Sequence, residues 1–108
     1  MKTIGLFCGG FSSEYDISMK SAQTIYDSFP KEYSIHKIQV TKEKWFCQST
    51  TEKNEGRFNR EDACIYFENN KIPIDFAIIC IHGDPGENGK IQAYLDIIGI
   101  PYLNSSAE

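Results

Sequence analysis

The chain has 108 residues, a length that allows one small domain with a hydrophobic core of its own. Hydrophobic residues make up 41% of the sequence and charged residues 24%, proportions that exclude a disordered chain and are typical of a soluble globular protein. The formal net charge is −4, the Lys and Arg residues are scattered, and no apolar stretch could span a bilayer, so nucleic-acid and membrane binding are not expected.

The N-terminus and the cysteines favour a cytoplasmic location. The opening segment reaches glycine after a very short apolar run, which makes it a poor signal peptide. The four cysteines are Cys8, Cys47, Cys64 and Cys80. None of them shows the C-x-x-C spacing, and Cys8 and Cys80 lie inside apolar runs. We therefore expect buried free thiols rather than disulfides or zinc ligands.

The first elements are a strand and a helix joined by a glycine turn. Residues 3–8 form an apolar run that ends at Gly9 and Gly10, which is typical of a buried strand that enters a tight turn. Apolar side chains then recur at helical spacing, which predicts a helix over residues 14–29. Ser13 has an acid three residues later, the spacing of a capping box, so we expect Ser13 to cap this helix.

The middle of the chain is predicted to be extended. Residues 33–40 alternate apolar and polar side chains, which indicates a second strand near an edge of the sheet. Residues 44–50 and 63–70 are also strand-like, and a polar stretch from 51 to 62 separates them. We interpret these two segments as one antiparallel pair with a long connection.

The last third repeats the strand, turn and helix order. Residues 75–81 are apolar on both faces, as in a central parallel strand covered by helices. A glycine-rich turn follows at 82–89, and then apolar side chains at helical spacing predict a second helix that ends at Gly99. Residues 100–104 read as a final short strand.

This order predicts an α/β domain with three layers, Rossmann-like, whose sheet is mostly parallel and carries a small antiparallel strand pair. Ligands of such sheets lie beyond the C-terminal ends of the strands, where loops enter helices. The glycine-rich loops at 9–13 and 82–89 would both lie at that edge, which is where we expect a functional site.

Glu14 and Ser18 are candidates in the first of these regions. An acid at a helix start compensates the helix dipole, and that role alone would explain Glu14. At the ligand edge of the sheet, however, its carboxylate could also hold a substrate ammonium group. Ser18, at the first helical turn, could bond back to the chain or orient Glu14.

His82 is the candidate in the second region. A histidine directly after a central strand and beside glycines could donate a hydrogen bond to a carboxylate or phosphate, or it could be an ordinary packed side chain. Neither glycine loop has the dinucleotide or P-loop pattern, and no cluster in the sequence has the spacing of metal ligands.

Two stretches resemble the D-alanine-D-alanine ligases. Residues 9–22, GGFSSEYDISMKSA, resemble the GGxSxE…VSxxSA segment that opens these enzymes. Residues 82–105, HGDPGENGKIQAYLDIIGIPYLNS, resemble their HGxxGEDGxxQGxLexxgIPYtGs segment, with Asn88 and Asn104 as departures from it. Both segments occur in the family's order, so the resemblance covers the chain, 1–108, as a substrate-binding pre-ATP-grasp domain.

The resemblance implies an activity and roles for particular residues. Such ligases use ATP and Mg²⁺ (or Mn²⁺) to join two D-alanines through a D-alanyl phosphate, for peptidoglycan and hence cell wall and cell shape. The acid matching Glu14 contacts the ammonium group of the first D-alanine, and the histidine matching His82 lies near its carboxylate and the transferring phosphate. Ser18 and Gly83 would support substrate binding. Four further glycines would shape the loops: Gly9, Gly10, Gly86 and Gly89.

The resemblance also implies that much of such an enzyme lies outside this sequence. A ligase of this family needs roughly two further domains of about 100–200 residues each, the ATP-grasp unit that binds the nucleotide and metal. We therefore expect an N-terminal fragment that is inactive alone, holds no metal and belongs to a protein that is homodimeric at full length.

Two alternatives stay open. One is a ligase that makes D-alanyl-D-lactate or D-alanyl-D-serine, because the choice of second substrate depends on residues outside this sequence. The other is a non-catalytic flavodoxin-like binding module, although the first strand ends in Cys-Gly-Gly and lacks the acidic pair of a phosphoacceptor pocket.

Overall fold

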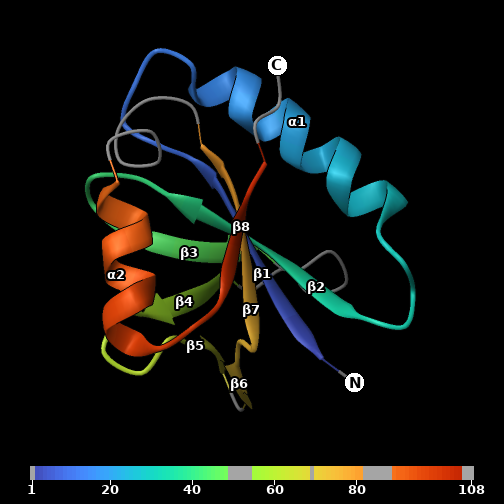
Figure 1. Cartoon of the computed structure of the whole chain (residues 1–108), viewed down its shortest axis with the longest axis vertical. Coiled ribbons are helices and arrows are strands. Elements are labelled where there is room, and N and C mark those ends of the chain that lie inside the picture. The colour runs from blue at the N-terminus through green and yellow to red at the C-terminus, as the bar shows by residue number, and fades with distance from the viewer. Residues whose placement is uncertain (1, 49–54, 69, 82–88, 106–108) are drawn as a thin grey trace.

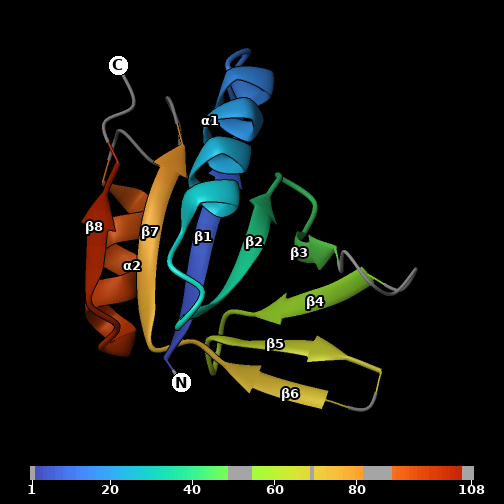
Figure 2. The ribbon, with the colours of Figure 1, turned by 90° about the vertical axis from the view of Figure 1, so that its right-hand side faces the viewer.

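The structure is a computed structural model that describes residues 2–48, 55–68, 70–81 and 89–105. In this part of the chain, eight strands form one strongly curled sheet, and one helix packs on each of its faces (Figures 1 and 2). The strand order is β6-β5-β4-β3-β2-β1-β7-β8. The elements are β1 (Thr3–Gly9), α1 (Tyr15–Ser28), β2 (Ser34–Val40), β3 (Trp45–Gln48), β4 (Glu55–Asn59), β5 (Cys64–Phe67), β6 (Asn70–Pro73), β7 (Phe76–Ile81), α2 (Lys90–Ile98) and β8 (Tyr102–Asn104).

The parallel half of the sheet has the predicted order. Strand β1 lies between β2 and β7 and is parallel to both, and β8 continues the parallel set on the far side of β7. Both β1 and β7 are buried on both faces because α1 covers one face and α2 the other. The three-layer α/β fold predicted from the sequence is therefore confirmed.

The antiparallel half is larger than predicted. Strands β3, β4, β5 and β6 form a meander of neighbouring antiparallel strands beside β2, so the sheet is about half parallel rather than mostly parallel. The expected pairing of residues 44–50 with 63–70 is wrong, because β4 lies between them and forms hydrogen bonds with both. Strand β2 is likewise an inner strand and not an edge, since β1 and β3 flank it.

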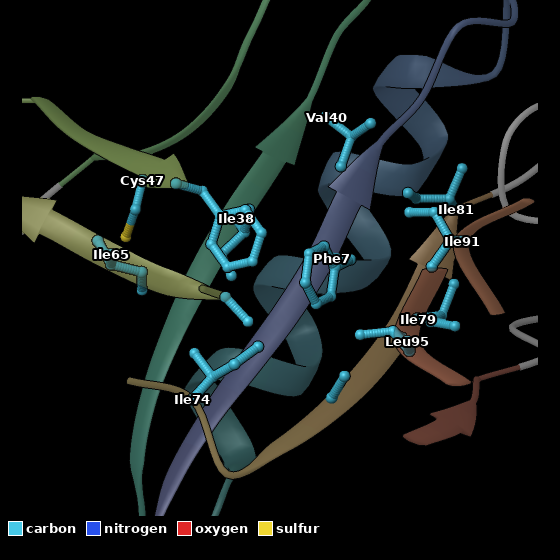
Figure 3. Packing of buried hydrophobic residues seen from close by; sticks show 13 residues of the cluster. Phe7, Ile38, Val40, Cys47, Ile65, Ile74, Ile79, Ile81, Ile91 and Leu95 are labelled. Atoms are coloured by element: carbon cyan, nitrogen blue, oxygen red, sulfur yellow. The ribbon is translucent and has the colours of Figure 1, made fainter. Parts of the chain in front are cut away.

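Two hydrophobic clusters fill the space on either side of the sheet. The α2-side cluster is built around Phe7, which packs edge-to-face against Trp45 and Phe58 and lies near Ile91 and Leu95 of α2 (Figure 3). The α1-side cluster is smaller and consists of Ile4, Leu6, Cys8, Ala22, Ile78 and Cys80. The alternation of side chains along β1 sends Phe7 to one cluster and its two neighbours to the other.

The helix ends agree only in part with the sequence pattern. Helix α2 ends as expected at Gly99, which has φ +81° and donates its N–H to the carbonyl of Leu95 at 2.9 Å. The capping box predicted at Ser13 is wrong: the residue at the N-cap of α1 is Glu14, and no side-chain hydrogen bond caps this helix in the described residues. No helix of the described residues is long and apolar enough to cross a membrane.

Candidate functional site

The strands β1, β2 and β7 end at the same level. Gly9 is in register with Val40 of β2 on one side and with Ile81 of β7 on the other. Strands β1 and β7 therefore both end at the C-terminal edge of the sheet, the edge where the sequence predicts the two glycine-rich loops. Residues 82–88 of the second loop lie outside the described residues.

The turn after β1 requires glycine. Gly9 has φ +95° and Gly10 has φ +101°, backbone conformations that residues with a side chain rarely adopt. A Cβ atom added to Gly9 would lie 2.6 Å from the ring of Tyr15, so this position also lacks the space for a side chain. Gly10 donates its N–H to the carbonyl of Val40 at 2.9 Å, which holds the start of the turn against β2.

Glu14 follows this turn at the N-cap of α1. Its N–H donates to the hydroxyl of Ser12 at 3.1 Å, and its carbonyl accepts the N–H of Ser18 at 3.0 Å. The residue is exposed at the C-terminal edge of the sheet, at the end of α1 where backbone N–H groups lack helical partners. A carboxylate at this place could accept hydrogen bonds from an ammonium group approaching the edge.

Ser18 is fully buried in the first turn of α1, and its side chain makes two hydrogen bonds to the strands β1 and β7. Its Oγ accepts the N–H of Gly9 at 2.8 Å and donates to the carbonyl of Cys80. Without the hydroxyl each of these buried backbone groups would lose a hydrogen bond, which typically contributes about 0.5–1.5 kcal/mol. The side chain thus connects the ends of β1 and β7, and both of its hydrogen bonds are made to the chain itself.

Tyr15 also contributes to this edge, and the sequence did not mark it. Its ring lies against Gly9, and its hydroxyl donates to Oε1 of Gln39 on β2 at 2.9 Å. Burial, and then the nearby Cys8 and Asp16, raise the pKa of Tyr15, so the phenol stays protonated at neutral pH. No spacing rule links a tyrosine to a glutamine 24 residues away, which is why this contact could not be predicted.

The thiols close to this edge are unreactive in character. Cys8 and Cys80 are in register on neighbouring strands and are buried in the α1-side cluster. Burial, followed by the neighbouring Cys80, raises the pKa of the Cys8 thiol to about 12. Burial also raises the pKa of Cys80. The predicted burial of the two thiols is confirmed, and they act as small apolar side chains.

Three of the candidate residues cannot be placed. His82, Gly83 and Gly86 lie outside the described residues, so their roles stay predictions. Gly89 is described and lies at the N-cap of α2 with φ +83°. Within the described ranges, no group of three or more His, Cys, Asp or Glu side chains is arranged to hold a metal ion.

Surface hollows of the described residues lie over the antiparallel half of the sheet. One has a volume of about 560 Å³ and is lined by Glu55, Arg57, Tyr66, Phe67 and Glu68. The other has a volume of about 400 Å³ and is lined by Glu43, Lys44, Trp45, Arg57, Phe58, Asn59, Arg60 and Glu61. Neither lining includes Glu14 or Ser18, so neither hollow coincides with the predicted site.

Comparison with known proteins identifies the family. Residues 3–105 match the family model described as "D-ala D-ala ligase N-terminus". A D-alanine-D-alanine ligase of Azobacteroides pseudotrichonymphae is 42% identical over 103 residues, which cover 94% of this chain and 32% of that relative.

Solved structures with the same fold include two named ligases. The crystal structure of D-alanyl-alanine synthetase A from Vibrio cholerae superposes with a TM-score of 0.80 at 38% identity, over 94% of this chain and 30% of that one. The VanG D-Ala:D-Ser ligase of Enterococcus faecalis gives a TM-score of 0.75 at 26% identity, over 94% and 34% of the two chains. The chain spans about a third of the length of the curated relatives it matches. It belongs to the D-alanine-D-alanine ligase family, in which it corresponds to the N-terminal part.

Proposed function

We propose that this chain supplies the site for the first D-alanine in an ATP-dependent ligase that joins two D-alanines through a D-alanyl phosphate for peptidoglycan synthesis. The observation that carries the proposal is the exposed carboxylate of Glu14 at the N-terminus of α1, within a chain of this family. A ligand-binding acid at the C-terminal edge of a parallel sheet agrees with where such folds bind ligands.

The proposed role of Glu14 is to hold the ammonium group of the substrate. Hydrogen bonds between an ammonium group and a carboxylate are shorter and stronger than those between neutral groups. The carboxylate would give both attraction and direction, because the rigid helix α1 and the Gly9-Gly10 turn fix the backbone on either side of it. The orientation of the substrate would then place its carboxylate away from Glu14.

His82 and Gly83 complete the proposal on the second loop. A histidine that donates to the substrate carboxylate would draw negative charge away from the oxygen that is to be phosphorylated. The N–H of a glycine can approach such a ligand closely because no side chain intervenes. The proximity of His82 to the end of β7 in the sequence supports this role.

ATP and Mg²⁺ would bind mainly outside this chain. The matched relatives are about three times as long as this chain. The groups that bind the nucleotide and the metal would then belong to the rest of a ligase of that length. The contribution of this chain would be to bind and orient the amino acid.

The test is a substitution in the full-length protein. Glu14→Gln removes the charge and keeps the shape, so we expect the KM for the first D-alanine to rise about ten- to a hundredfold, the value of one charge-assisted hydrogen bond. Steady-state kinetics with varied D-alanine at saturating ATP measure it. Asp16→Asn is the matched control, because Asp16 is an exposed acid in the first turn of the same helix.

The control should leave the KM for D-alanine within about twofold of wild type, since surface substitutions change little. Kinetics of Glu14→Gln that match those of Asp16→Asn would remove Glu14 from the site and with it the observation that carries this proposal.

A D-alanine-D-serine ligase is a second candidate. The likeness to the VanG D-Ala:D-Ser ligase covers the same 94% of this chain as the likeness to the Vibrio cholerae protein, so this part of the fold is common to both named activities. The first substrate, D-alanine, is also common to them. Mass spectrometry of the product formed from a mixture of D-alanine and D-serine separates the two.

A further inference from the structure

Ser18 connects three segments of the candidate site. Its Oγ accepts the N–H of Gly9, where β1 turns out of the sheet, and donates to the carbonyl of Cys80, near the end of β7. Its own N–H donates to the carbonyl of Glu14 at 3.0 Å. Ser18 is therefore bonded to the ends of the two strands that lead into the family segments, and to the backbone of Glu14.

Ser18 makes these hydrogen bonds in a place that water does not reach. Ser18 is 0% exposed and is the one polar residue among the fully buried side chains of the described part of the chain. It lies beside Ala22 and the thiols of the α1-side cluster, where water does not reach the freed backbone groups. The hydroxyl thus adds a buried side-chain link between the end of β1 and the end of β7, beside the pairing of the two strands.

The geometry points to Ser18 as a positioning residue. We propose that Ser18 holds the Gly9 turn, Glu14 and the end of β7 in the relative placement that D-alanine binding requires, without touching the substrate itself. This inference rests on the proposed function. Of the roles expected from the sequence, the hydrogen bonds favour the bond back to the chain over a direct substrate contact, because the hydroxyl already bonds to two backbone groups.

The expected kinetic effect in the full-length ligase follows from misplacement of the Gly9 turn and Glu14. Ser18→Ala removes a hydrogen bond from both backbone groups and lets the turn shift, so we expect kcat/KM for D-alanine to fall about ten- to a hundredfold. The KM for ATP should stay within about twofold. Ser18→Cys, kept in reducing buffer, has nearly the same shape and a weaker donor, and its kcat/KM should lie between those of wild type and the alanine variant.

Two control variants separate positioning from simple destabilisation. Ser28→Ala, on the same helix, removes a hydroxyl that is exposed and bonds only to carbonyls of its own helix. Ile65→Val makes a small cavity in the α2-side cluster, far along the sheet from the Gly9 turn. Both should keep kcat/KM within about twofold of wild type at a temperature where all variants are folded.

Hydrogen exchange gives the second readout. In the wild type, the bonded N–H of Gly9 should be protected, and in Ser18→Ala the peptide that contains Gly9 should exchange at least about tenfold faster. Ile65→Val should leave the exchange of that peptide unchanged. If the alanine variant does not fold, the cysteine variant serves for both readouts.

The inference is overturned if the Ser18 variants lose no more kcat/KM than Ile65→Val, or if the exchange of the Gly9 peptide does not change. Its failure is distinguishable from that of the proposed function. A wild-type protein with no D-alanine-dependent activity would refute the function, whereas normal activity in Ser18→Ala would refute the positioning role alone.

Discussion

At the scale of single residues, the candidate site divides into what lies near in sequence and what folding brings together. Glu14 could be placed at a helix start because glycines and helical periodicity surround it. The partners of Ser18 could not, since Cys80 is 62 residues away and the bond depends on β1 and β7 being neighbours. The pattern singled out Ser18 but did not indicate what it contacts.

The buried thiols allow a prediction about pH. Burial raises the pKa of Cys8 to about 12 and that of Cys47 to about 11, against 9.0 in an unfolded chain. A raised pKa keeps the thiol neutral up to a higher pH. At pH 9 about half of the thiols of an unfolded chain are ionised, whereas roughly 1% or less of Cys8 and of Cys47 is ionised in the folded protein. Alkylation of both cysteines by iodoacetamide in the native protein should be at least about a hundredfold slower than in urea, as measured by mass spectrometry.

Native alkylation of Cys8 or Cys47 at the rate seen in urea would show that these side chains are open to solvent. The buried register of β1 and the packing of β3 against the α2-side cluster would then be wrong.

At the scale of elements, regular apolar patterns were sufficient to predict a helix or strand and its bounds, and irregular patterns were not. The bounds of β1, β7 and the two helices agree with the sequence within about two residues, because each has a long apolar run or a clear helical period. Strand β4 was missed because Glu55–Asn59 holds a glycine and two charged residues, which read as a loop. Only its neighbours β3 and β5 supply the hydrogen bonds that make it a strand.

Gly56 in β4 leads to a prediction. A Cβ atom at this buried position would lie 2.7 Å from the ring of Phe67 and 3.1 Å from a methyl group of Ile65. Gly56→Ala should therefore lower the free energy of unfolding by about 1–3 kcal/mol through overpacking. Thermal or urea unfolding measures this loss.

Phe67→Leu supplies the matched background, because a smaller side chain leaves room for the new methyl group. Gly56→Ala should cost at least about 1 kcal/mol less in that background, as a double-mutant cycle would report. Equal costs in the two backgrounds would show that the ring of Phe67 does not lie over Gly56.

At the scale of the whole molecule, the sequence predicted the layers but not the extent of the meander. The strand-helix-strand order at both ends dictated a parallel centre, and the structure has it. Long-range contacts join the antiparallel half to α2: the hydroxyl of Tyr94 in α2 donates to the carbonyl of Arg60 beyond β4 at 2.7 Å, and its ring packs edge-to-face on Trp45 of β3. Local patterns contain no information about such contacts.

The central proposal is that this chain positions a D-alanine for a ligase whose remaining parts bind ATP. The most direct measurement is ADP release by the full-length protein with and without D-alanine, with mass spectrometry of the product. The account predicts ADP release that depends on D-alanine and is accompanied by D-alanyl-D-alanine, and none from the 108-residue chain alone. ADP release that is independent of D-alanine, or a product without D-alanine as its first residue, would contradict it.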